Sequence, residues 1–171
     1  LPIMARWCTI RQGIEKSCLD RRVEIDRAMK ILTVSDKVVN WIYSPRLKEK
    51  FGDVELVLSC GDLPFYYLEY IVSILNVPLF YVMGNHDKKV EYSANGRART
   101  APRGCINIDN RVIQHKGLLI GGLEGSMRYS REPRFQYTDP EMHLKVLQMA
   151  PQLLLNRIFR GRYLDILITH A

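Results

Sequence analysis

The sequence has few cysteines, no long apolar run and no leader-like N-terminus, and each absence argues against a class of protein. Its 171 residues include four cysteines without paired spacing: Cys8, Cys18, Cys60 and Cys105. This spacing argues against a disulfide framework or a cysteine-rich zinc site and favours a reducing compartment, so we expect a cytoplasmic protein. The longest mostly apolar stretch, 70–83, is interrupted by Asn76 and Pro78 and is too short to span a bilayer. Residues 1–16 contain no apolar core followed by a small-residue cleavage site, so we expect neither a signal peptide nor a membrane partner.

Positive charge is in excess and unevenly distributed. The formal net charge is +7, and the segment 88–134 contains ten Lys or Arg residues against four acidic residues. Such a segment favours anionic ligands, which include phosphorylated small molecules, nucleic acids and acidic proteins. A solvated loop whose charges only maintain solubility has the same composition, so charge alone leaves both interpretations open.

Three apolar runs of strand type, 31–34, 54–59 and 79–83, alternate with two segments of helical type. The first helical segment follows Ser44-Pro45 and ends at Gly52, and the second opens at Pro64. Near-continuous apolar strands joined by helical crossovers indicate a parallel sheet covered on both faces. The sequence therefore predicts the α/β class.

The remaining segments are less regular. Residues 106–115 predict a hairpin that turns at Asp109-Asn110, and 117–126 predict a strand that ends in a glycine-rich bend. A helix is expected to begin at Thr138-Asp139-Pro140 and to be split or kinked at Pro151, before a last strand over 164–169. We expect residues 1–28 to be an N-terminal extension outside the core, with a marginal helix over 14–29, and residues 29–171 to form the domain.

Polar side chains follow the predicted strands where each of them ends. Asp36 follows the first strand, Asp62 the second and Asn85 the third, within Gly84-Asn85-His86-Asp87. In parallel sheets, ligands bind at the carboxyl ends of the strands, so the topology brings these residues to one edge. Each of them alone is an ordinary turn or cap residue, whereas their joint placement indicates a site.

Four motifs in this order resemble those of the calcineurin-like metallophosphoesterase superfamily. They are SDKV (35–38), CGDLP (60–64), GNHD (84–87) and ITHA (168–171), and the similarity extends over about 30–171. The resemblance implies a layered α-β-β-α sandwich. It also implies a metal-dependent phosphoesterase that hydrolyses phosphate mono- or diesters with a metal-bound hydroxide, on a small-molecule or nucleic-acid substrate.

The same resemblance implies a centre of two divalent metal ions. Asp62 would bridge the two ions, Asp36 would bind the first, and Asn85 and His170 would bind the second. Such mixed oxygen and nitrogen ligands suit Mn, Fe, Zn or Ni and do not select one of them. Two ions together activate water and neutralise charge on the phosphate.

The catalytic roles implied by the resemblance fall on the GNHD motif. His86 would be the general acid that protonates the leaving oxygen, and Asp87 would orient its imidazole and favour the charged form. Asn85 and His86 would also contact the substrate.

The sequence departs from the family pattern in two places. Val38 stands where the D-x-H motif has a histidine, so either Asn40 substitutes for it or the first metal is bound weakly. No G-H-x-H motif follows ITHA, so we expect a domain that is incomplete at its C-terminus and has little or no activity as it stands. These departures leave an alternative, a catalytically impaired scaffold of the same fold that binds a protein or nucleic acid through 88–134. The oligomeric state is not predicted.

Overall fold

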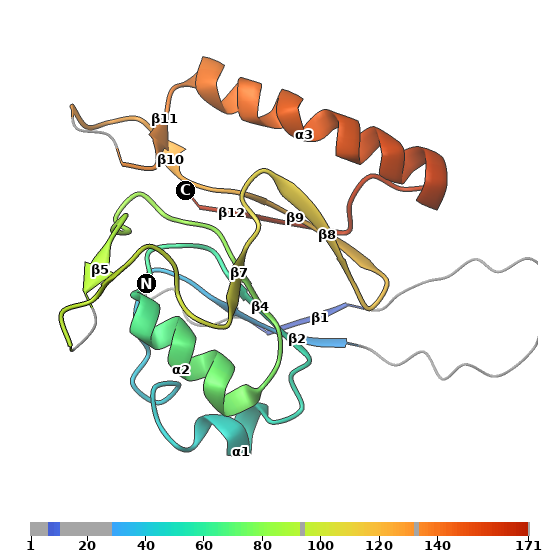
Figure 1. Cartoon of the computed structure of the whole chain (residues 1–171). Coiled ribbons are helices and arrows are strands. Elements are labelled where there is room, and N and C mark those ends of the chain that lie inside the picture. Colours follow the sequence, from blue (N-terminus) through green and yellow to red (C-terminus); the bar gives the residue numbers. More distant parts are fainter. Residues whose placement is uncertain (1–6, 11–28, 93–94, 132–133, 171) are drawn as a thin grey trace, which may run out of the picture.

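The computed structural model describes residues 7–10, 29–92, 95–131 and 134–170. These residues form two main sheets with helices on their outer sides (Figure 1). The helices are α1 (Leu47–Phe51), α2 (Phe65–Leu75) and α3 (Asp139–Arg160). The strands are β1 (Trp7–Ile10), β2 (Met29–Val34), β3 (Leu56–Ser59), β4 (Leu79–Tyr81), β5 (Glu91–Tyr92), β6 (Ala98–Arg99), β7 (Cys105–Asn107), β8 (Arg111–His115), β9 (Leu118–Leu123), β10 (Ser126–Met127), β11 (Gln136–Tyr137) and β12 (Ile166–Thr169).

The larger sheet has five strands in the order β1-β2-β3-β4-β7. The strands β2, β3, β4 and β7 run parallel, which confirms the predicted parallel sheet, and β1 adds an antiparallel edge. Of the predicted extension 1–28, residues 7–10 thus join this sheet. The marginal helix expected over 14–29 lies outside the described residues except for Met29, which begins β2.

The smaller sheet has the order β12-β9-β8. Its strand β8 belongs to the segment 106–115, which the sequence predicted to be a hairpin. That hairpin is wrong because β7 pairs with β4 in the larger sheet, whereas β8 pairs with β9 in the smaller one. Between them the chain crosses from one sheet to the other, and the backbone N–H of Asp109 donates to the Asn107 side chain over 2.7 Å. The actual hairpin joins β8 to β9 through Lys116 and Gly117, which both have positive φ.

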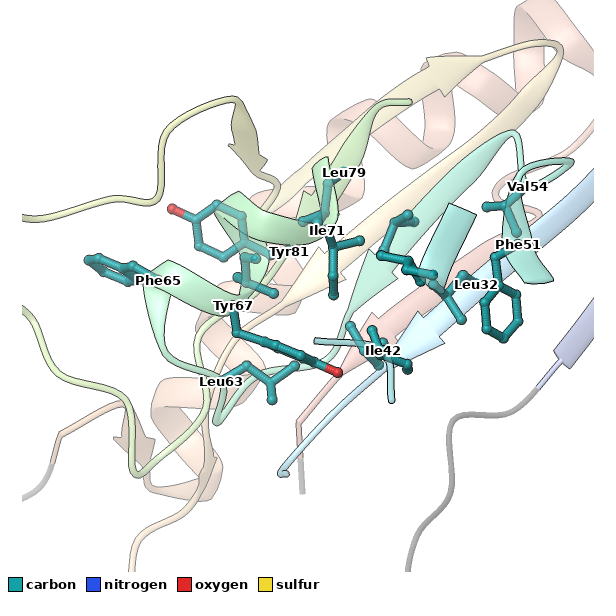
Figure 2. Close-up of a cluster of buried hydrophobic side chains, with 14 of the residues drawn as sticks. Leu32, Ile42, Phe51, Val54, Leu63, Phe65, Tyr67, Ile71, Leu79 and Tyr81 are labelled. Carbon is teal, nitrogen blue, oxygen red and sulfur yellow. The ribbon is translucent and has the colours of Figure 1, made fainter. Parts of the chain in front are cut away.

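Two apolar clusters set the order of the layers. The first lies between the larger sheet and the helices α1 and α2, and Figure 2 shows Leu32 and Leu79 of that sheet together with Phe51 of α1. The second lies between the two sheets, where Phe80 of the larger sheet packs in the same cluster as Ile120 of the smaller one. The larger sheet is therefore covered on both faces, as its apolar strands predict.

The third helix covers the outer face of the smaller sheet. Gln152 of α3 accepts the backbone N–H of Val112 in β8 over 2.9 Å, and Met149 is the buried residue of this helix. The layers therefore follow the order helices, larger sheet, smaller sheet, helix (Figure 1), and the predicted α/β class is confirmed.

The helices differ from prediction in two details. α1 begins at Leu47 instead of directly after Ser44-Pro45, because the Ser44 hydroxyl donates to the carbonyl of Trp41 and does not cap the helix. α3 begins at the expected Thr138-Asp139-Pro140, where Thr138 and Glu141 form a capping box, and it continues through Pro151, so the helix is not split there. Hydrogen bonds between its side chains and the segment 110–112 hold the helix on both sides of this proline. No helix among the described residues is long and apolar enough to cross a membrane.

Candidate metal centre at the carboxyl ends of the strands

Four loops meet where β2, β3, β4 and β12 end, and each carries one predicted metal ligand. Nε2 of His170 lies 2.7 Å from Oδ1 of Asn85 and 3.3 Å from Oδ2 of Asp62. Ligand atoms of Asp36, Asp62 and His170 all lie within 4.8 Å of one another. The structure thus brings all four predicted ligands together, and their role in binding metal stays a prediction.

Two glycines allow these loops to approach so closely. A Cβ on Gly61 would lie 2.5 Å from the backbone nitrogen of Gly84 and 3.1 Å from Nδ1 of His170. A Cβ on Gly84 would lie 2.1 Å from Oδ1 of Asp62 and 2.7 Å from its backbone nitrogen. Because no side chain fits between the two loops, the CGDLP and GNHD motifs both require glycine where they meet.

The backbone of the site is held by the carboxylates of Asp62 and Asp87. Oδ2 of Asp87 accepts the N–H groups of Gly84, over 2.7 Å, and Asp62, over 3.0 Å. Oδ1 of Asp62 accepts the N–H of His86 over 2.8 Å. Burial raises the pKa of Asp87 against the opposing effect of these two N–H donors.

His86 and Asp87 have different surroundings from those implied by the resemblance. Asp87 is buried and bonded to backbone, whereas His86 is exposed. Among the described residues no hydrogen bond joins the Asp87 carboxylate to the His86 ring. The proposed orientation of that ring by Asp87 is therefore without a supporting contact, and the catalytic roles of both residues stay predictions.

Both ring nitrogens of His170 face oxygen atoms. Nδ1 lies 2.8 Å from the carbonyl oxygen of Cys60, and Nε2 faces the oxygens of Asn85 and Asp62. A neutral imidazole carries one N–H, and these oxygens only accept hydrogen bonds. Whichever nitrogen carries the proton, the lone pair of the other one points at oxygen lone pairs. A cation bound between Nε2 and these oxygens would remove this repulsion.

Tyr129 also contacts the site, although no sequence pattern predicted it. The Asn85 amide donates from Nδ2 to the Tyr129 hydroxyl over 2.5 Å. Tyr129 lies beyond the glycine-rich end of β9, and the two residues are 44 positions apart. No residue spacing or motif indicates such a contact.

A second charged cluster connects α3 to the end of β9. Lys145 of α3 contacts the carboxylates of Asp109, at 2.8 Å, and Glu124, at 3.4 Å. The Tyr137 hydroxyl donates to Glu124 over 2.6 Å. Burial raises the pKa of Glu124, and burial together with this carboxylate raises the pKa of Tyr137. The cluster is an ion-pair network that holds the helix to the smaller sheet.

The first motif, SDKV, has Val38 where the family pattern has a histidine. Val38 is half-buried and packs against the apolar cluster beside α1 and α2. Asn40 is exposed. Valine has no ligand atom to offer at this position, and the substitution of Asn40 for the missing histidine stays a prediction.

No family model matches the chain, and neither a curated protein nor a solved structure does. The donor set of the site is therefore the basis for assigning its chemistry. Carboxylate oxygens, an amide oxygen and an imidazole nitrogen suit Mn, Fe, Zn or Ni.

Proposed function

We propose that the chain is a metal-dependent phosphoesterase with the layered sandwich of the calcineurin-like type. The observation that carries this proposal is that Nε2 of His170 converges with Asn85 Oδ1 and Asp62 Oδ2 while Nδ1 faces the Cys60 carbonyl, so that one N–H serves only one side of the ring. A divalent cation among these atoms satisfies every lone pair at once. The free thiols of Cys60 and Cys105 support a reducing compartment such as the cytoplasm.

Asp62, Asn85 and His170 would hold one divalent cation, and oxygens of Asp36 and Asp62 would serve a second. When bound, such cations acidify the attacking water and neutralise charge on the phosphate of a mono- or diester. The contact of Nδ1 with the Cys60 carbonyl supports this role for His170, because an N–H donated there directs Nε2 into the site.

His86 is the group proposed to protonate the leaving oxygen. Its backbone N–H is fixed by Asp62 over 2.8 Å, while the residue itself is exposed. An exposed imidazole beside the ligands is accessible to an arriving substrate. Removing a general acid typically slows a reaction by roughly 10²–10⁴-fold.

The alternative is a catalytically impaired scaffold, and the observation that favours it is that Val38 packs against the apolar cluster where the family pattern has a metal-binding histidine. The basic segment 88–134 supports it less, because several of its cationic side chains are engaged within the chain. Arg99 pairs with Glu69, and Lys116 pairs with Glu55. In that case His170 would only hydrogen-bond within the chain, and no metal would bind.

The test combines calorimetric titration of Mn²⁺ with hydrolysis of an aryl phosphodiester. Asn85→Ala should weaken Mn²⁺ binding by at least the roughly 10–100-fold that loss of a ligand's hydrogen-bond partner costs. His86→Ala should leave Mn²⁺ affinity unchanged and slow whatever hydrolysis the unmodified chain supports. His143→Ala, an exposed histidine of α3, is the matched control and should change neither. Absence of Mn²⁺ binding to the unmodified chain would refute the proposal and favour the scaffold.

A further inference from the structure

The two ends of the Asn85 amide have different partners. Oδ1 faces Nε2 of His170 at 2.7 Å, and Nδ2 donates to the Tyr129 hydroxyl over 2.5 Å. An amide that rotated by half a turn would present its N–H groups to the cation site and lose a ligand oxygen. The Tyr129 hydroxyl accepts the N–H of Nδ2 and so holds the far end of the amide in place, with Oδ1 on the side of the site.

The segment that carries Tyr129 is anchored at its backbone. Oε1 of the buried Gln136 accepts the N–H groups of Tyr129, over 3.2 Å, and Ser130, over 3.1 Å. The adjacent Arg128 pairs with Glu141 of α3 at 2.9 Å. The Tyr129 backbone is thus held in place, although 67% of the residue is exposed.

We propose that Tyr129 is a positioning residue that holds the Asn85 side chain where its amide oxygen reaches the cation site. This inference rests on the proposed function, because it concerns the same site. Metal ligands are commonly oriented by such outer hydrogen bonds, and loss of one lowers metal affinity about 10–100-fold.

The test is a double-mutant cycle read by Mn²⁺ calorimetry on the full chain. Tyr129→Phe removes only the hydroxyl and should weaken binding about tenfold without changing the urea midpoint of unfolding. In the Asn85→Ala background the same substitution should have no further effect. Tyr92→Phe, which removes the hydroxyl of an exposed tyrosine of β5, is the matched control and should leave binding unchanged.

Each contrary result has a distinct meaning. If Asn85→Ala weakens binding while Tyr129→Phe does not, the positioning role is wrong and the proposed function stands. If Tyr129→Phe weakens binding equally with and without Asn85, Tyr129 does not act through Asn85 and the inference is also wrong. If Asn85→Ala leaves Mn²⁺ binding unchanged, the proposed metal centre fails, and this inference fails with it.

Discussion

Replacing Gly84 by alanine tests the close approach of the two motif loops. The added Cβ would lie 2.1 Å from Oδ1 and 2.7 Å from the backbone nitrogen of Asp62. Rotation of the Asp62 side chain relieves only the first clash, so the backbone of one loop has to move. That movement breaks two hydrogen bonds, which the backbone N–H of Asp62 donates to Asp87 and the backbone N–H of His86 donates to Asp62.

The expected cost follows from these contacts. Two lost hydrogen bonds contribute about 1 kcal/mol each. Overpacking a tightly packed site adds about 1–3 kcal/mol. The free energy of unfolding should therefore fall by about 3–5 kcal/mol, which lowers the Tm by roughly 10 °C in a chain of this size. Mn²⁺ affinity should fall as well, because Asp62 is displaced.

Urea unfolding and Mn²⁺ calorimetry measure the two effects. Gly96→Ala is the control, since its φ of +75° gives it a conformational cost but no atom lies within 4 Å of the added Cβ. It should lose only about 1–2 kcal/mol and keep its Mn²⁺ affinity. If Gly84→Ala is no more destabilised than Gly96→Ala, the reasoning about the shared glycine contact is refuted.

Three further substitutions test other parts of the structure. Glu91 accepts the N–H of Phe65 and so caps α2, whose N-cap residue makes no side-chain cap of its own. Glu91→Ala should lower the free energy of unfolding in urea by about 1 kcal/mol, and an unchanged value would contradict this role. Lys145→Met leaves two largely buried carboxylates without their cation and should lower the free energy of unfolding by about 3 kcal/mol. Lys30→Met, at an exposed ion pair, should lower it little, and equal effects of the two substitutions would count against the network. Burial raises the pKa of Glu124 above its ordinary value of 4.5, so the folded state binds this proton more tightly than the unfolded state does. The free energy of unfolding should therefore fall as the pH rises from 4.5 through the raised pKa. Glu124→Gln should flatten that part of the curve of stability against pH, and an unchanged curve would refute the assignment.

The parallel strands were predictable because their apolar runs and crossover lengths constrain the topology. The sheet membership of 106–115 was not, because Asp109-Asn110 is compatible with a hairpin turn and with a crossing between sheets. The continuity of α3 through Pro151 depends on contacts with β8 that no local pattern encodes.

The site was predictable to the extent that strand ends define it. Asp36, Asp62 and Asn85 were placed by the rule that carboxyl ends of parallel strands share an edge. The bonding of Asp87 to backbone N–H groups and the contact of Tyr129 with Asn85 depend on loop conformations, which sequence patterns do not specify.

The central claim is that Asp36, Asp62, Asn85 and His170 form a divalent-cation site. Crystals grown with Mn²⁺ and measured for anomalous scattering locate the ion directly. The account predicts the strongest anomalous peak within coordination distance of Asp62 and of Nε2 of His170. A structure without a peak there, in which His170 stays hydrogen-bonded to Asn85 and Asp62, would contradict it.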